Sequence, residues 1–150
     1  LSLDEMSSRR RVAFTHALLF VLGFTLVFLL LGATASALGR ALAPLRDEGV
    51  VIVGSGLSYH NLRLFGPGAK EPSAQFDAWL AEAMNADPKT RVEKLKAWEQ
   101  APAARICHPR EDHLIPLMAA VGAAESEKAT RVYHDKNVFG GVTASSYRFG

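Results

Sequence analysis

The residues of this sequence best suited to bind a metal ion or to move a proton are His60, His108 and His113. His60 follows the apolar run Val50–Val53, and His113 leads into another apolar run. An imidazole is a common ligand of iron and zinc, and its pKa near neutrality suits acid and base catalysis. Spacing alone leaves two interpretations open: a metal or proton-transfer site, and ordinary hydrogen-bonded histidines.

The elements that would position these histidines form an α/β pattern. The β-branched run Val50–Val53, ended by glycines, predicts a buried strand and a tight turn. Ligands in α/β proteins gather beyond the carboxyl ends of such strands, which is where His60 lies. Apolar residues at helical spacing predict helices over residues 73–84, 88–100 and 111–121, and alternation in the tail predicts short closing strands.

The charged residues of the second predicted helix are expected to face solvent. They are Lys89, Arg91, Glu93, Lys94 and Lys96, whereas the apolar positions of the same helix are expected to face inward. In the whole chain 17 basic residues stand against 15 acidic ones, a net charge of +2, so we expect no nucleic-acid partner.

The single cysteine excludes an internal disulfide and redox chemistry by paired thiols within this chain.

The amino-terminal part predicts a membrane helix. From Val12 to Leu38 there is no Asp, Glu, Lys or Arg, and about 20 apolar residues are enough to cross the hydrocarbon. Arg9–Arg11 precede this span, so the amino terminus is expected in the cytoplasm and the chain in the membrane as a single-pass protein with the lipid bilayer as a partner. The first residue is Leu1 rather than Met, which suggests a fragment or a processed product.

Several segments occur in the order that is typical of one enzyme family. The sequence resembles the 4,5-DOPA dioxygenase-like, LigB-type branch of class III extradiol ring-cleavage dioxygenases in Val51–Arg63, Phe76–Leu80, Trp98–Ala124 and Ser145–Gly150. The resemblance implies a cytoplasmic enzyme with a mixed sheet and flanking helices, which binds a catechol-type substrate and O₂ at Fe(II) or Zn(II). It implies that His113 is a metal ligand, and that His60 is the catalytic acid/base group or a further ligand.

The same resemblance implies an incomplete site. The family takes further histidine ligands from its amino-terminal half, which is absent here, and catalytic metal sites generally use about three protein ligands. We therefore expect the isolated chain to be inactive, unless a homo-oligomer completes the site.

Residues 1–42 are similar to a segment of the CcdA/DsbD-like family of cytochrome c biogenesis, although they contain no cysteine. The stretch Leu38–Leu42 fits both families, so we hypothesise a chimera of a transmembrane segment, residues 1–42, and a partial dioxygenase domain, residues 43–150. The predicted fold class is therefore a partial α/β extradiol dioxygenase domain preceded by one transmembrane helix. Alternatives are a membrane component of thiol-disulfide transfer and a membrane-anchored, nonenzymatic binding module.

Overall fold

The computed structural model describes residues 14–16, 19, 37–124 and 126–150, and the chain divides into the compact units Leu1–Thr34 and Ala35–Gly150. In the first unit the described residues are helical. The second unit begins with a helix over residues 37–47. After it come η1 (Leu62–Leu64), η2 (Pro67–Ala69), α2 (Lys70–Asn85), α3 (Pro88–Lys96), η3 (Trp98–Gln100), α4 (Ala104–Cys107), α5 (Ile115–Ala123), β1 (Ala129–Val138) and β2 (Val142–Phe149).

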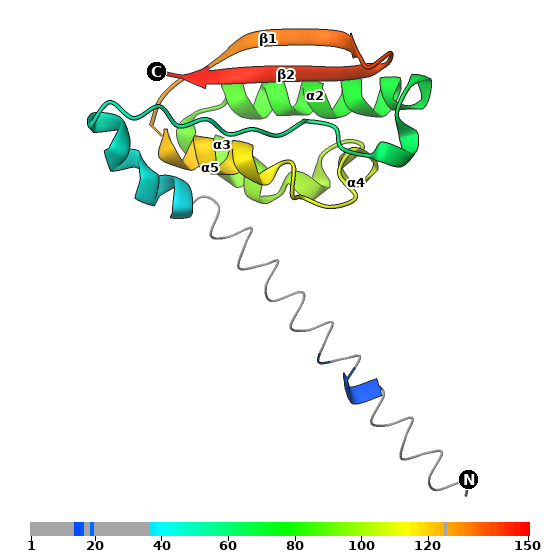
Figure 1. Cartoon of the computed structure of the whole chain (residues 1–150), viewed down its shortest axis with the longest axis horizontal. Helices are drawn as coiled ribbons and strands as arrows, with labels where there is room; N and C mark the ends of the chain where they lie inside the picture. The colour runs from blue at the N-terminus through cyan, green and yellow to red at the C-terminus, as the bar shows by residue number, and fades with distance from the viewer. Residues whose placement is uncertain (1–13, 17–18, 20–36, 125) are drawn as a thin grey trace, which may run out of the picture. The chain divides into compact units, whose positions relative to one another are not determined.

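The closing strands form a hairpin along α2 (Figure 1). β1 and β2 pair antiparallel, from Ala129 opposite Phe149 to Val138 opposite Val142. The turn between them includes Gly140 at a φ of 78°, a left-handed conformation that glycine adopts without steric cost. The prediction of closing strands is confirmed, and their partners are each other.

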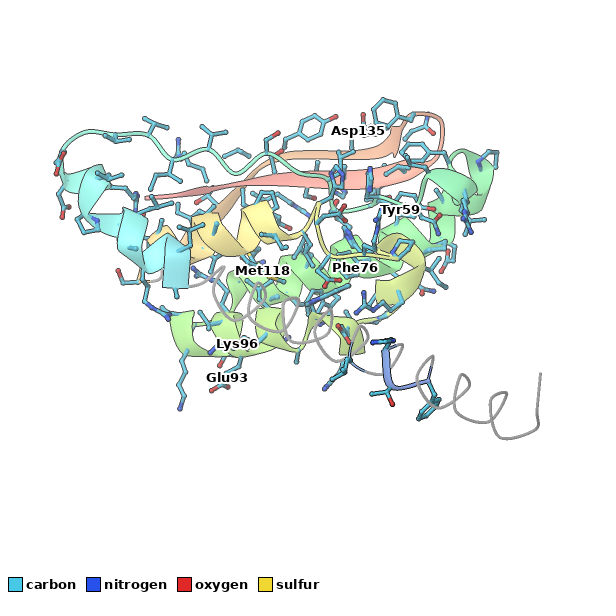
Figure 2. All side chains as sticks on the ribbon, turned by 60° about the horizontal axis from the view of Figure 1, so that its bottom comes forward. Tyr59, Phe76, Glu93, Lys96, Met118 and Asp135 are labelled. Carbon is cyan, nitrogen blue, oxygen red and sulfur yellow. The ribbon has the colours of Figure 1, made fainter. Side chains whose placement is uncertain are left out.

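The central helix, α2, confirms the helix predicted over residues 73–84. Its buried residues recur at helical spacing and include Phe76, Leu80 and Met84. Phe76 lies in one core cluster with Tyr59 and Met118, whereas Glu93 and Lys96 point outward from α3 (Figure 2). The packing of this apolar face against the hairpin, α3 and α4 holds the second unit together.

The remaining helices differ from the prediction at their ends. α3 begins at Pro88 after the cap Asp87, whose side chain accepts a hydrogen bond from Thr90 N, but it ends at Lys96 and is followed by the separate turn η3. α5 begins at Ile115 rather than at residue 111. Proline lacks a backbone N–H and is favoured in the first helical turn, so Pro116 fits a later start.

The predicted buried strand Val50–Val53 is wrong. Within the described part of the chain the only sheet contains β1 and β2, and residues 50–57 are extended without strand pairing. Val51 and Val53 are 82% and 80% exposed. A β-branched run indicates an extended backbone, but a strand also needs a neighbour to receive its hydrogen bonds.

The predicted membrane helix is also wrong, and with it the single-pass membrane location. Most of Val12–Leu38 lies outside the described residues, and no helix among those described is long and apolar enough to cross a membrane. The end of this segment, Ala37 and Leu38, belongs to helix 37–47. This helix packs on α5 so closely that a Cβ at Gly39 would lie 2.3 Å from Ala119 O. An uncharged apolar run is typical of a buried helix as well as of a membrane span, so hydropathy alone did not separate the two.

Candidate functional site

His60 and His113 come from different segments and meet face to face. His60 lies in the loop after the extended segment, and His113 lies in the turn before α5. Their ring centroids are 3.3 Å apart and their planes are inclined by 25°. Both side chains are partly buried. The structure therefore brings together the two residues that the resemblance assigns to a site, and it keeps both rings within reach of solvent.

Hydrogen bonds to the end of α4 hold the loop that contains His60. His60 N–H donates to Cys107 O at 2.8 Å, and Asn61 Nδ2 donates to Ile106 O at 2.8 Å. Asn61 also caps η1, because its side-chain oxygen accepts a hydrogen bond from Arg63 N at 3.1 Å. The loop is thus fixed at His60 and at the residue that follows it, which gives the backbone of His60 a defined position.

His108, which the sequence placed among the candidate metal-binding or proton-transfer residues, instead supports this loop from inside the core. It is fully buried between the rings of Phe76 and Trp98. Its Nε2 donates to Ser58 O at 3.0 Å, so the other ring nitrogen is the deprotonated one. Burial lowers the pKa of His108 to about 4 and keeps the ring neutral near pH 7.

A cleft of about 700 Å³ opens beside His60. Arg63, Arg110 and Asp112 line it together with His60, so the cleft contains two cationic groups and one carboxylate. Its volume lies in the range of about 300–1,000 Å³ that small-molecule sites occupy. The arrangement suits a small polar or anionic ligand next to an imidazole.

The surroundings of His60 favour its neutral form. Burial lowers the pKa of His60, the neighbouring His113 lowers it further, and Arg110 adds a smaller effect in the same direction, while Asp112 opposes them. A neutral imidazole has a lone pair that can accept a proton or bind a metal ion. His60 is therefore suited to either role.

The residues present do not form a complete metal site. In the described ranges no group of three or more His, Cys, Asp or Glu side chains could hold a metal ion. Catalytic metal sites usually have about three protein ligands. His60 and His113 could supply only part of such a set.

A serine, a histidine and an aspartate also meet between α2 and the hairpin, but not as a nucleophilic triad. His134 Nδ1 lies 3.0 Å from Ser145 Oγ and 3.4 Å from Asp77 Oδ2. In a catalytic triad the serine and the acid contact opposite ring nitrogens. Here both contacts fall on the same nitrogen, so this group does not activate the serine.

The fold and the paired histidines define an α/β unit with two stacked imidazoles, one of which borders a cleft. Residues 21–150 match the family model described as the catalytic LigB subunit of aromatic ring-opening dioxygenase. The chain belongs to this family of extradiol ring-cleavage dioxygenases.

Similar proteins include several dioxygenases. The chain is 36% identical over 115 residues to a 4,5-DOPA dioxygenase extradiol of Beta vulgaris. This match covers 75% of this chain and 42% of the Beta vulgaris protein. It is 35% identical over 126 residues to Dioxygenase tasH of Hapsidospora irregularis, with 75% of this chain and 38% of that protein covered. A crystal structure of an uncharacterized Escherichia coli K12 protein matches with a TM-score of 0.68 and 25% identity, over 79% of this chain and 50% of that one.

These matches overturn the predicted fusion. The dioxygenase family model begins at residue 21, inside the segment that was assigned to a CcdA/DsbD-like membrane helix, and it continues through Leu38–Leu42 without interruption. One family therefore spans the supposed junction, so neither a chimera nor a cytochrome c biogenesis component explains the chain. The resemblance to the extradiol dioxygenases is confirmed.

Proposed function

We propose that this chain provides the His60–His113 part of a metal-dependent extradiol dioxygenase that opens catechol-type aromatic rings with O₂. His113 serves as a ligand of Fe(II) or Zn(II), and His60 serves as the acid/base group beside the metal or as a further ligand. The observation that supports this proposal is the contact between the two imidazoles, with centroids 3.3 Å apart, at the edge of a cleft.

The cleft beside His60 suits the proposed substrate class. A neutral His60 can accept a proton from a substrate hydroxyl, which is the usual role of a general base. Arg63 and Arg110 add positive charge to the same cleft, and guanidinium groups bind carboxylates and other oxyanions well. A catechol with an anionic substituent is therefore favoured over a neutral one.

The isolated chain is expected to lack ring-cleavage activity. It spans 42% of the length of the Beta vulgaris relative and 50% of the solved Escherichia coli chain. The described residues contribute two imidazoles where about three ligands are usual. A further part of a LigB-type domain, or another protomer of a homo-oligomer, would have to complete the site.

The proposal is tested by anaerobic titration of the full chain with Fe(II), and separately with Zn(II), followed by calorimetry. The variants are His60→Ala and His113→Ala, with His134→Ala as the matched control away from the cleft. Loss of at least about tenfold in metal affinity, equivalent to about 1.4 kcal/mol, is expected for His113→Ala, because this variant lacks one proposed ligand. His60→Ala keeps the affinity if His60 is an acid/base group and loses it if His60 is a ligand. Equal affinity of the unchanged chain and His113→Ala would contradict the proposal.

Oxygen uptake with catechol is the second measurement. With the full chain alone, oxygen uptake is expected not to exceed the uptake caused by the same metal in buffer without protein. Metal-dependent uptake that disappears in His60→Ala and His113→Ala, but not in His134→Ala, would show that a second protomer completes the site. Uptake that survives in all three variants would show that the activity does not come from this site.

A further inference from the structure

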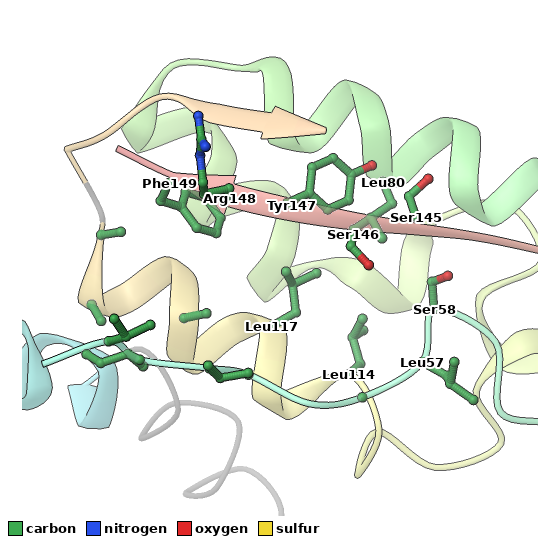
Figure 3. A pocket seen from close by; sticks show the side chains of 18 of the residues that line it. Leu57, Ser58, Leu80, Leu114, Leu117, Ser145, Ser146, Tyr147, Arg148 and Phe149 are labelled. Atoms are coloured by element: carbon green, nitrogen blue, oxygen red, sulfur yellow. The ribbon is translucent and has the colours of Figure 1, made fainter. Parts of the chain in front are cut away.

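The two ends of the β-hairpin have different surroundings. Near the open end, residues 145–149 of β2 line a groove of about 660 Å³ together with parts of the extended segment 50–57 (Figure 3). The other end is the tip, residues 138–142, which contributes no residue to that groove. The tip lies instead at the start of α2, close to the loop that follows His60 (Figure 1).

The tip has an aromatic residue where its backbone favours a small or polar one. Phe139 and Gly140 have φ angles of 53° and 78°, and Gly141 N donates a hydrogen bond to Val138 O at 3.3 Å. Two successive positive φ angles are those of a type I′ turn, whose first central position favours Asn, Asp or Gly. A bulky side chain in the left-handed region is sterically strained. Phe139 is also 68% exposed, so burial of its ring offers little compensation.

The ring of Phe139 contacts the loop beside the cleft. Its centroid lies 5.7 Å from that of Phe65, with the ring planes inclined by 56°. The two backbones approach each other as well, because a Cβ at Gly141 would lie 2.4 Å from Gly66 O. The tip of the hairpin therefore packs directly on this loop.

Phe65 is the residue at which η1 ends. All three residues of η1 line the cleft beside His60, and none of them is buried. A turn of three residues without a buried side chain has little stability of its own, so its flanking residues must fix its position. Asn61 caps its start, whereas at its end Tyr59 OH donates to Leu64 O at 3.1 Å and Phe65 supplies the contact with the hairpin.

We infer that the tip of the hairpin positions the wall of the cleft, and that Phe139 is a positioning residue that holds η1 through Phe65. Arg63 of η1 and His60 line the same cleft, so this contact sets where the guanidinium group stands relative to the imidazole. A residue that served the turn alone would be Asn or Gly, so the presence of Phe139 favours a role for its ring. The importance of this position for ring cleavage rests on the proposed function, whereas the contact itself does not.

The test separates the ring of Phe139 from the stability of the turn in the full chain. Phe139→Asn removes the ring and places a favoured residue at a positive φ, so the urea midpoint of unfolding is expected to stay unchanged or to rise. Amide hydrogen exchange at Arg63 and Leu64 is expected to become about two- to tenfold faster, because one aromatic pair has been removed. Phe139→Tyr keeps the ring and is expected to restore the exchange rates of the unchanged chain.

The matched control is Tyr133→Thr, which removes another exposed aromatic ring from the same hairpin and replaces it with a residue that suits a strand. It is expected to leave exchange at Arg63 and Leu64 unchanged. If circular dichroism shows that Phe139→Asn does not fold, Phe139→Gly takes its place, because glycine also adopts a positive φ without steric cost.

Phe65→Leu gives the second arm of the test. In this background the ring of Phe139 has lost its aromatic partner, so adding Phe139→Asn is expected to cause little further increase in exchange at Arg63 and Leu64. Equal effects of Phe139→Asn with and without Phe65→Leu would show that Phe139 does not act through Phe65.

Other outcomes would also overturn the inference. They are exchange in η1 that is unchanged in Phe139→Asn, that rises equally in Tyr133→Thr, or that Phe139→Tyr does not restore. A urea midpoint that falls together with the faster exchange would show that the ring only stabilises the fold. Exchange is measured without metal, so a failure of metal binding would contradict the proposed function and leave this result unaffected.

Discussion

The imidazole of His60 lies against that of His113, with ring centroids 3.3 Å apart, although the two residues belong to separate segments of the chain. Burial is the main cause of the lowered pKa of His60, and His113 is the next. In His113→Ala the pKa of His60 is therefore expected to rise toward 6.5 without reaching it. NMR titration of the His60 ring protons measures the change, with His134→Ala as the control. An unchanged or lowered pKa would contradict the influence of the neighbouring ring.

His108 makes the stability of the chain depend on pH. Its pKa is about 4 in the folded chain against an ordinary value of 6.5, so between these values the unfolded chain binds the extra proton. The free energy of unfolding should therefore be highest above pH 6.5 and should fall as the pH drops toward 4, by a few kcal/mol at most. Urea unfolding at a series of pH values measures this slope.

The matched variant for this prediction is His108→Gln. Its amide can still donate to Ser58 O but does not titrate, so the slope between pH 6.5 and 4 should become shallower. If the slope is the same in His108→Gln, other groups cause the acid sensitivity. His60 shifts in the same direction and contributes a smaller part that remains in the variant.

Gly56 is predicted to be needed for the approach of the extended segment to α5. A Cβ at Gly56 would lie 2.2 Å from His113 O, so Gly56→Ala must push two backbone segments apart. We expect a loss of about 1–3 kcal/mol in the free energy of unfolding. Gly68→Ala is the control, because a Cβ at Gly68 meets no atom within 4 Å and the change should stay within about 0.5 kcal/mol. Equal effects of the two variants in urea unfolding would refute the close approach.

Arg91, which was predicted to face solvent, is only 2% exposed. Its guanidinium donates to Glu127 O at 2.8 Å and lies over the ring of Phe149 at 5.6 Å. Arg91→Met keeps most of the aliphatic part but removes these contacts, so a loss of about 1–3 kcal/mol is expected. Lys96→Met, on the exposed side of the same helix, should change stability by less than about 0.5 kcal/mol. Thermal unfolding of both variants tests the difference.

Cys107 should be unreactive in the folded chain. Its thiol is buried, donates to Pro72 O at 3.3 Å and has a pKa raised to about 12 by burial. The thiolate is the reactive form, so a disulfide reagent at pH 8 should label Cys107 only after denaturation. Rapid labelling without denaturant would show that the core around α4 opens easily.

Local patterns in the sequence predicted the parts of the fold that depend on local spacing. The apolar spacing from Phe76 to Met84 predicted α2, and the alternating tail predicted β1 and β2. The resemblance of the segments around His60 and His113 indicated the dioxygenase family, which the comparisons confirm. Helix spacing and strand alternation are properties of neighbouring residues, so they can be read without knowing the tertiary structure.

Other features depended on contacts between distant segments. Whether Val50–Val53 is a paired strand depends on a neighbouring strand that the local sequence does not reveal. Arg91 is buried because its guanidinium contacts Glu127 O and the ring of Phe149, which are distant in the sequence. Hydropathy could not distinguish a membrane span from an apolar segment of a protein fold, because both exclude charge. The sequence alone thus determined the family and the local elements. Only tertiary packing placed the ring of His60 on that of His113 and formed the groove beside β2. Each of these two features is built from chain segments that meet only after folding.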